Sequence, residues 1–411
     1  MKVSKHRIMI LTIVLCACQW FAIFKTGDFI YKADLINLST IFISVIVIAL
    51  LSFNPVMQKK VTGKYRLWIV GTILLWFIEC ANSTINYAKY GQSFLSTVAS
   101  SFGTLSVISL FPLCYLQEKI NDENYLKNLI KNFGLVAALL SIAQVFLYDY
   151  NIILLDITGS STRYGSLRFS IAGYLVSISI IITLFDWIET KKKSDLTKIL
   201  VEIIFLIYAQ KTRTEIMYII LAVYFVSILF LKNKNAKIIL SALGVVILFV
   251  ATVSGFASSF LSELDSDVGI NMRFETINFY MQQFYKHPVL GMGFIRSSTT
   301  NTTLYGLLYG CGQYAGYFYR DDVGIIGVIN ERGICGIIWY CSALILMLGQ
   351  IISLYRYNKK KNVWMLCMWV YILICSINII WVNSLRITSL TIVIALVQHY
   401  YYRMRCSEYN E

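Results

Sequence analysis

Charged residues and proline are both scarce in this chain of 411 residues. The low charge argues against a soluble domain, and the low proline content argues against frequent helix breaks. Charged residues make up 14% of the sequence and hydrophobic residues 57%, whereas soluble domains usually carry about 25% charged residues. With only three prolines, few helices are forced to break, so the sequence predicts mostly unbroken helices. The chain also lacks proline- and serine-rich linkers. The composition is therefore that of a protein that crosses a membrane many times.

The ten cysteines have no CxxC spacing and no histidine partners at metal-ligand spacing. Most of them lie inside hydrophobic runs, where a free cysteine behaves as a small apolar residue. The sequence therefore predicts no disulfide framework, no metal site and no cofactor.

Twelve hydrophobic runs come close to the roughly 17 to 25 residues that cross about 30 Å of hydrocarbon. Backbone hydrogen bonding in lipid favours helices over strands, so we expect an all-α polytopic membrane helical bundle with twelve spans. Two runs are short, which leaves eleven spans as the alternative. The division is residues 1–256 with nine spans, a loop at 257–322, and residues 323–411 with three more. The runs are Ile8–Phe24, Leu35–Phe53, Leu67–Ala81, Phe94–Leu116, Leu126–Tyr148, Arg168–Ile188, Leu196–Ala209, Arg213–Leu231, Ala236–Phe256, Val323–Tyr355, Asn362–Ile380 and Ser384–Tyr402.

The net charge of +14 follows the membrane topology and does not indicate nucleic-acid binding. If the N-terminus is cytoplasmic, the inner segments hold 18 Lys and 5 Arg, and the remaining positions hold 5 Lys and 8 Arg. The positive-inside rule then places both termini in the cytoplasm and the loop at 257–322 outside. The excess of arginine outside indicates an anionic ligand there, because arginine suits bidentate contact with phosphate or carboxylate.

The long loop begins with a predicted amphipathic helix from about Val268 to Tyr285. His287-Pro288 is expected to end this helix, and Gly291 and Gly293 to form a tight turn. The apolar face of the helix is expected to lie on the membrane or on the bundle. Its members are Ile270, Phe274, Ile277, Met281 and Phe284.

Further along the loop, aromatic residues alternate with glycines between Tyr305 and Tyr319. Flat aromatic faces beside a flexible backbone suit stacking on sugar rings, whereas the alternative is an aromatic belt at the membrane interface. The predicted glycan-binding residues are Arg296, Arg320, Tyr314 and Tyr317.

Several of these motifs resemble a known family. HPVLGMGF at His287–Phe294 and GVINERGICGI at Gly327–Ile337 resemble two elements of O-antigen polymerases and O-antigen ligases, in the same topological places. Arg273 matches the arginine at the start of the family's outer helix. Two weaker similarities are Arg168-Phe-Ser and Thr212-Arg213-Thr214, each at the head of a span.

The two branches of the family differ before the Glu331 element. Ligases place a histidine about nine residues earlier, where this chain has Asp321 and Asp322. This favours the polymerase branch and leaves the ligase as the alternative. The resemblance implies transfer of a glycan from undecaprenyl pyrophosphate to the sugar of a lipid-linked repeat unit, at the outer face of the cytoplasmic membrane. A chain-length regulator and a flippase are further partners that it implies.

Glycosyl transfer of this kind, without a metal, needs positively charged side chains fixed beside the pyrophosphate and a base that takes the proton of the acceptor hydroxyl. The predicted pyrophosphate ligands are Arg168, Arg213, Arg273 and Arg386, and the candidate catalytic residues are Asp322, Glu331, His287 and Asp321. Each has a structural alternative. Arg168 and Arg213 could mark span ends, His287 could serve packing, and Arg332 and Glu79 could form structural ion pairs.

Two other functional classes stay open. A flippase for lipid-linked oligosaccharides, or another transporter, would also have about twelve helices, but it does not need a long outer loop. A receptor or scaffold is disfavoured because the chain has no soluble domain.

Overall fold

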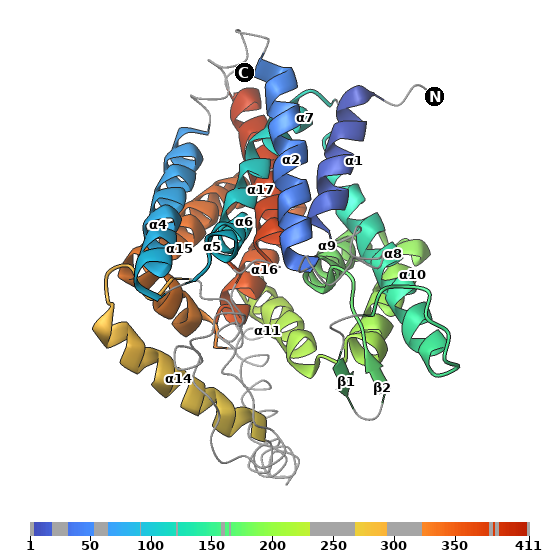
Figure 1. The fold of residues 1–411 in the computed structure, drawn as a ribbon. Helices are drawn as coiled ribbons and strands as arrows, with labels where there is room; N and C mark the ends of the chain where they lie inside the picture. Colours follow the sequence, from blue (N-terminus) through green and yellow to red (C-terminus); the bar gives the residue numbers. More distant parts are fainter. Residues whose placement is uncertain are drawn as a thin grey trace.

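The computed structural model describes residues 4–18, 32–52, 65–90, 92–120, 122–157, 161–163, 166–230, 268–293, 323–377, 381–382 and 386–408. These residues form a bundle of helices with one short hairpin (Figure 1). The helices are α1 (Lys5–Ala17), α2 (Lys32–Ser52), α4 (Arg66–Tyr90), α5 (Phe94–Ser100), α6 (Phe102–Leu105), the 3-10 helix η2 (Ser106–Ser109), α7 (Leu110–Glu118), α8 (Tyr125–Tyr148), α9 (Gly173–Thr190), α10 (Lys193–Ile204), the π-helix η3 (Phe205–Ala209), α11 (Arg213–Phe230), α14 (Val268–Lys286), α15 (Ile325–Tyr357), α16 (Lys359–Cys375) and α17 (Ile387–Glu408).

The helical membrane architecture predicted from the sequence is confirmed in its main feature. Among the described residues, five segments are long and apolar enough to cross a membrane: Arg66–Lys89, Thr97–Glu118, Tyr125–Tyr148, Gly173–Thr190 and Ile325–Tyr357. Three shorter apolar helical segments are Ile36–Leu50, Thr214–Leu229 and Lys361–Cys375. The predicted span Ala236–Phe256 lies outside the described residues, and the number twelve stays a prediction.

Large apolar side chains on several helices face outward from the bundle. Phe42 on α2, Phe77 on α4, Ile220 on α11 and Ile345 on α15 are all at least 60% exposed. Many other large apolar side chains are also exposed, and apolar exposure on this scale is rare on soluble monomers. The outward faces therefore fit a hydrocarbon environment.

The centre of the bundle is α17. Its residues from Ile387 to Tyr400 are buried, and it contacts α1, α7 and α15. Its sequence is apolar on nearly every side up to Val397, which is the pattern of a helix surrounded by others. Thr388 Oγ1 donates a hydrogen bond of 2.9 Å to the carbonyl of Ala17, so α17 is joined directly to α1.

The two ends of the described chain lie at one end of the bundle, and α14 and the hairpin lie at the other (Figure 1). In Figure 1 the start of α1 and the end of α17 lie at the top, whereas α14 and the hairpin lie at the bottom. This arrangement agrees with a topology in which both termini share one side and the long loop lies on the other. Which side faces the cytoplasm stays a prediction.

Two helices depart from the unbroken form expected of most spans. The span expected at Phe94–Leu116 is present as the apolar segment Thr97–Glu118, which is long enough to cross a membrane, but its helix is divided into α5, α6, η2 and α7. In addition, α15 has a break without proline at Gly333, whose backbone lies at φ 59° and ψ −156°. Proline is one cause of helix breaks, but at Gly333 the break is accompanied by hydrogen bonds from the turn that follows α14.

The described residues also include one short β-hairpin, which an all-helical bundle does not have. Strands β1 (Ser161–Arg163) and β2 (Ser166–Arg168) pair antiparallel, with Ser161 opposite Arg168. Arg168 was expected at the head of a helix, but it ends β2, and α9 starts only at Gly173.

Candidate functional site

The two motifs that carry the family resemblance pack against each other. The chain leaves α14 after Lys286 and turns through His287–Gly293, and this turn contacts the break in α15 at Gly333. We call residues 287–293 and 330–335 together the corner. The predicted end of the helix at His287-Pro288 and the turn at Gly291 and Gly293 are confirmed, because α14 ends at Lys286 and both glycines have positive φ.

Four backbone hydrogen bonds join the two halves of the corner. Met292 N donates to Asn330 O at 2.7 Å, and Gly293 N donates to Glu331 O at 2.8 Å. In the opposite direction, Ile334 N donates to Pro288 O at 2.9 Å and Cys335 N to Val289 O at 3.2 Å. The turn thus pairs with donors and acceptors that a break in a helix would otherwise leave unsatisfied. Irregular backbone inside a membrane bundle is tolerated where protein buries it in this way.

The corner also fixes the position of α14. Asn330, which is 1% exposed, donates through Nδ2 to Gln283 Oε1 at 3.2 Å. Tyr280 packs against Val323, and this small cluster includes Ile277. The predicted apolar face is only partly the packed face, because Phe274 is 63% exposed. The difference arises because polar contacts from Asn330, which a hydropathy pattern does not register, orient the helix.

A buried ion network supports the corner from the inside. Arg332, 4% exposed, is ion-paired with its neighbour Glu331, and its Nη2 lies 3.3 Å from Glu79 Oε2. The same Nη2 donates to Thr104 Oγ1 at 3.2 Å, and Thr104 Oγ1 donates to Glu79 Oε2 at 3.1 Å. Asn82 Nδ2 donates to the Glu331 carbonyl at 3.2 Å. Helices α4 and α6 therefore hold the broken turn of α15 through one guanidinium and two carboxylates.

The structural alternatives for Glu79 and Arg332 fit these contacts, since both side chains are buried and paired with each other. Glu331 is 1% exposed and paired with Arg332, which suits a residue that positions the corner.

A second group of residues surrounds Glu215 near the starts of α9 and α11. Arg168 Nε donates to the Gln210 carbonyl at 3.0 Å, and Phe169 N donates to the Ala209 carbonyl at 3.0 Å. Strand β2 is thereby tied to the end of η3. The wide π-turn of η3 and the left-handed backbone of Lys211 (φ 53°) bring Gln210 into this place.

Glu215 lies at the centre of this group and is 1% exposed. Its carboxylate accepts from Gln210 Nε2 at 3.0 Å and from Ser177 Oγ at 3.0 Å. Arg386 and Arg168 both lie close enough to interact with it electrostatically. We call Arg168, Ser177, Gln210, Glu215 and Arg386 the Glu215 cluster.

Aromatic rings hold Arg386 in the Glu215 cluster. Its Cζ lies 4.5 Å from the centroid of the Tyr174 ring, a cation–π distance. The Tyr174 ring is in edge contact with Trp381 at 5.7 Å, and Trp381 with Tyr371 at 6.0 Å. Arg386 immediately precedes Ile387, the first residue of α17, so these rings hold its guanidinium near the start of that helix.

The structure thus brings together two of the four predicted pyrophosphate ligands, Arg168 and Arg386. The backbone of Arg213 starts α11, two residues before Glu215, and the backbone of Arg273 lies in the second turn of α14. The side chains of these two arginines lie outside the described part of the structure. So do six other predicted site residues, Asp321, Asp322, Arg296, Arg320, Tyr314 and Tyr317.

Several residues of both groups were missed by the sequence interpretation. Gln210, Ser177, Thr104, Asn82 and Asn330 are polar, nearly fully buried and hydrogen-bonded to residues that form or support these two groups. Asn330 lies inside one recognised motif and Gln210 two residues before another, so both could have been found from the motifs. Thr104 and Ser177 could not, because one polar residue in an apolar helix has many equivalent positions.

The protonation of His287 follows from its place at the end of α14. Burial, and then the positive charges of Lys89 and Lys286, lower the pKa of His287 from its usual value. The imidazole is therefore neutral at neutral pH, the form in which a histidine can accept a proton.

This lowered pKa predicts a pH dependence of stability. A histidine that binds its proton less tightly in the folded state destabilises the fold as the pH falls below its unfolded pKa of about 6.5. We expect His287→Gln to remove this small loss. Thermal unfolding of both proteins in detergent, at about pH 7.5 and about pH 5.5, measures it. The variant should gain relative to the wild type at the lower pH, and equal shifts of both proteins would contradict the prediction.

Comparison with known proteins does not assign the chain to a family. No protein-family model matches the chain, and a search of curated proteins finds no match.

Proposed function

We propose that the chain is a membrane glycosyltransferase that polymerises lipid-linked oligosaccharide repeat units of a surface polysaccharide. In this reaction a glycan leaves undecaprenyl pyrophosphate and is transferred to the sugar of an incoming repeat unit. Capsule, exopolysaccharide and O-antigen are the polymers that this chemistry serves.

The observation that carries the proposal is the Glu215 cluster. Two arginines from distant parts of the sequence, together with the backbone of a third, meet near the starts of α9, α11 and α17. Lipid-linked pyrophosphate carries its charge at headgroup depth, and guanidinium groups at span ends meet it there. Stabilisation of a leaving pyrophosphate by fixed positive charge needs no metal.

The corner supports the same proposal by a separate observation. Its two halves are the motifs that resemble the polymerases, and they are joined in space although about 40 residues separate them. The neutral His287 at its edge and the acidic pair Asp321-Asp322 are the groups proposed to take the proton of the acceptor hydroxyl. Glu331 is proposed to act by holding the corner in place.

A strain in which the gene is deleted tests the function directly. We expect single lipid-linked repeat units to accumulate and the polymer to be lost, as shown by glycan size analysis. Free undecorated polymer in that strain would indicate a ligase, and complete loss of outward-facing repeat units would indicate a flippase.

We further expect Arg168→Lys to be nearly as damaging as Arg168→Ala. Among the described residues, only Nε of Arg168 has a hydrogen-bond partner, the Gln210 carbonyl, so its two Nη groups can bind a phosphate together. A lysine cannot make both contacts, and the loss of a charge-assisted pair corresponds to about a tenfold or larger fall in rate. Polymer yield at equal membrane abundance measures it. Full activity of the lysine variant would contradict a phosphate contact and would indicate that Arg168 only marks the end of a span.

A further inference from the structure

A buried carboxyl that the proposed reaction does not use lies between α8, α9 and α10. Glu202, near the end of α10, is 0% exposed. Ser179 Oγ on α9 donates to its Oε1 at 2.5 Å. Among the described residues, none makes a hydrogen bond to its Oε2. The side chain thus lies in the interior with one of its two oxygens unsatisfied.

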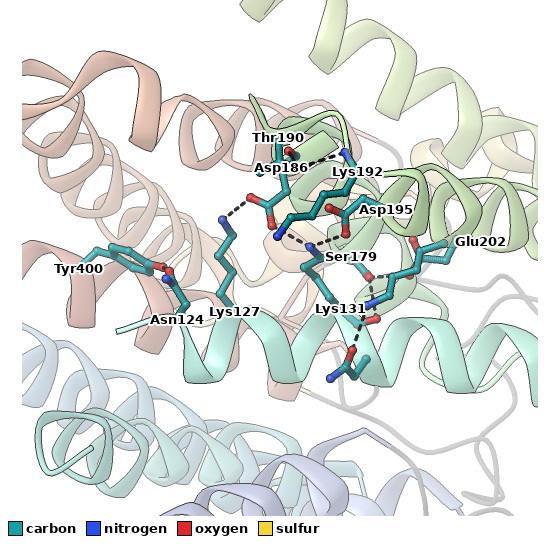
Figure 2. A network of polar contacts seen from close by, with 12 residues as sticks. Asn124, Lys127, Lys131, Ser179, Asp186, Thr190, Lys192, Asp195, Glu202 and Tyr400 are labelled. Atoms are coloured by element: carbon teal, nitrogen blue, oxygen red, sulfur yellow. Dashed lines mark hydrogen bonds and ion pairs between the residues drawn. The ribbon is translucent and has the colours of Figure 1, made fainter. Parts of the chain in front are cut away.

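The charged groups around Glu202 are matched with one another (Figure 2). From α8, Lys131 Nζ lies 2.8 Å from Asp186 Oδ2 on α9 and 3.0 Å from Asp195 Oδ1 on α10. Lys127, also on α8, is ion-paired with the other oxygen of Asp186. Lys198 on α10 is half-buried, and its Nζ donates to Asn132 Oδ1 at 3.1 Å.

These contacts leave Glu202 without a counter-ion of its own. Lys198 and Lys131 act on Glu202 electrostatically, but no ion pair joins either of them to it in the described part of the chain. A buried carboxylate with one hydrogen bond and no paired cation is costly, by several kcal/mol in general. Neutralisation by a proton removes that cost. Titratable groups inside a membrane bundle commonly mark proton sites for this reason.

The polar groups also connect Glu202 with one end of the bundle. The Ser179 hydroxyl that contacts Glu202 also lies 3.4 Å from the carbonyl of Lys131, whose ammonium joins Asp186 and Asp195. Beyond this ion cluster, α9 ends at Thr190, and Lys191 to Lys193 are exposed. Through Ser179, Glu202 is thus in contact with the backbone of Lys131, whose side chain belongs to the ion cluster at that end of the helices.

We propose that Glu202 is a proton-binding site in the interior of the bundle, loaded from the end where Lys131, Asp186 and Asp195 meet. One proton from water converts its carboxylate to the neutral acid, and no other bond forms or breaks. The site goes beyond the proposed glycosyl transfer, which takes place around the arginines and the corner. It makes the charge state of the bundle depend on the pH at the Lys191–Lys193 end.

A hydrophobic carbodiimide tests the proposal on the full-length protein in detergent, because this reagent forms a stable N-acylurea with protonated carboxyl groups in apolar surroundings. Trypsin releases residues 199–211, in which Glu202 is the sole carboxyl side chain, and residues 214–232, in which Glu215 is the sole one. Glu215 is the matched control, because it is equally buried but receives two hydrogen bonds and lies near two arginines.

We expect the adduct at neutral pH on peptide 199–211, at least about tenfold above that on peptide 214–232, since two hydrogen bonds favour the ionised form. Glu202→Gln, which keeps the shape and the contact with Ser179, should remove the adduct. Equal labelling of the two peptides, or none on peptide 199–211, would overturn the proposal.

Infrared spectroscopy gives a second readout that does not depend on entry of the reagent. The carbonyl band of a protonated carboxylic acid should be present in the wild type and lost in Glu202→Gln. Its absence from the wild type would overturn the proposal. Neither readout involves polymer synthesis, so either result stands whether or not the proposed function is correct.

Discussion

Alanine in place of Gly333 is expected to destabilise the protein by about 3 kcal/mol or more and to abolish polymer synthesis. The backbone at Gly333 (φ 59°, ψ −156°) lies in a region that residues with a Cβ rarely enter. A Cβ at this position would also stand 2.4 Å from Val289 O and 2.6 Å from Pro288 O. These carbonyls accept the hydrogen bonds of Cys335 and Ile334, so they cannot move away without opening the corner.

Gly349→Ala is the matched control for this prediction. Gly349 lies in the same helix, and a Cβ there would meet nothing within 4 Å. Because alanine favours helix over glycine, we expect no loss and a gain of up to about 1 kcal/mol. Thermal unfolding in detergent compares the two variants. Similar losses for both would mean that the break at Gly333 is not what makes glycine necessary.

Arg332→Met should be the second most damaging substitution, with a loss of about 3 to 5 kcal/mol. Methionine has a long unbranched chain and fills much of the same space, so the main change is the removal of the guanidinium. Glu79 and Glu331, 3% and 1% exposed, would then face each other with no cation between them. Removal of one partner from a buried ion group costs far more than replacement of the whole group.

Two controls separate this buried charge effect from a general loss of ion pairs. The triple variant Glu79→Gln, Glu331→Gln, Arg332→Met should recover most of the lost stability, because it leaves no unpaired charge. Lys361→Met removes a partner of Glu123 from a pair whose side chains are 47% and 31% exposed. It should cost no more than about 1 kcal/mol. A triple variant as unstable as Arg332→Met would show that packing, and not charge, explains the effect.

The sequence predicted those parts of the fold that depend on local patterns. The helix expected at Val268–Tyr285 is Val268–Lys286 in the structure, because the apolar spacing and His287-Pro288 define its extent locally. The structural ion pair that the sequence left open for Glu79 is also present, since Glu79 is buried beside Arg332. Arg168 and Arg386 lie near the same carboxylate, that of Glu215, and the anionic ligand predicted for them stays a proposal.

The features that the sequence did not predict depend on contacts between distant segments. The break at Gly333 exists because the turn after α14 supplies hydrogen bonds to it, and a glycine inside an apolar run gives no sign of such a partner. The hairpin before α9 is stabilised by the end of η3 through the Phe169 and Arg168 contacts, which local propensity does not register. The pairing of Arg332 with Glu79 joins residues far apart in the chain, so no spacing rule could identify it.

The central position of α17 has a consequence for biogenesis. The hydroxyl of Thr388 bonds to a carbonyl 371 residues earlier, and helices α1, α7 and α15 all pack around this late segment. During translation the early helices therefore enter the bilayer long before the core that unites them exists. Contacts of such long range make assembly slow. Until residue 388 has been synthesised, α1, α7 and α15 lack the central helix around which they pack.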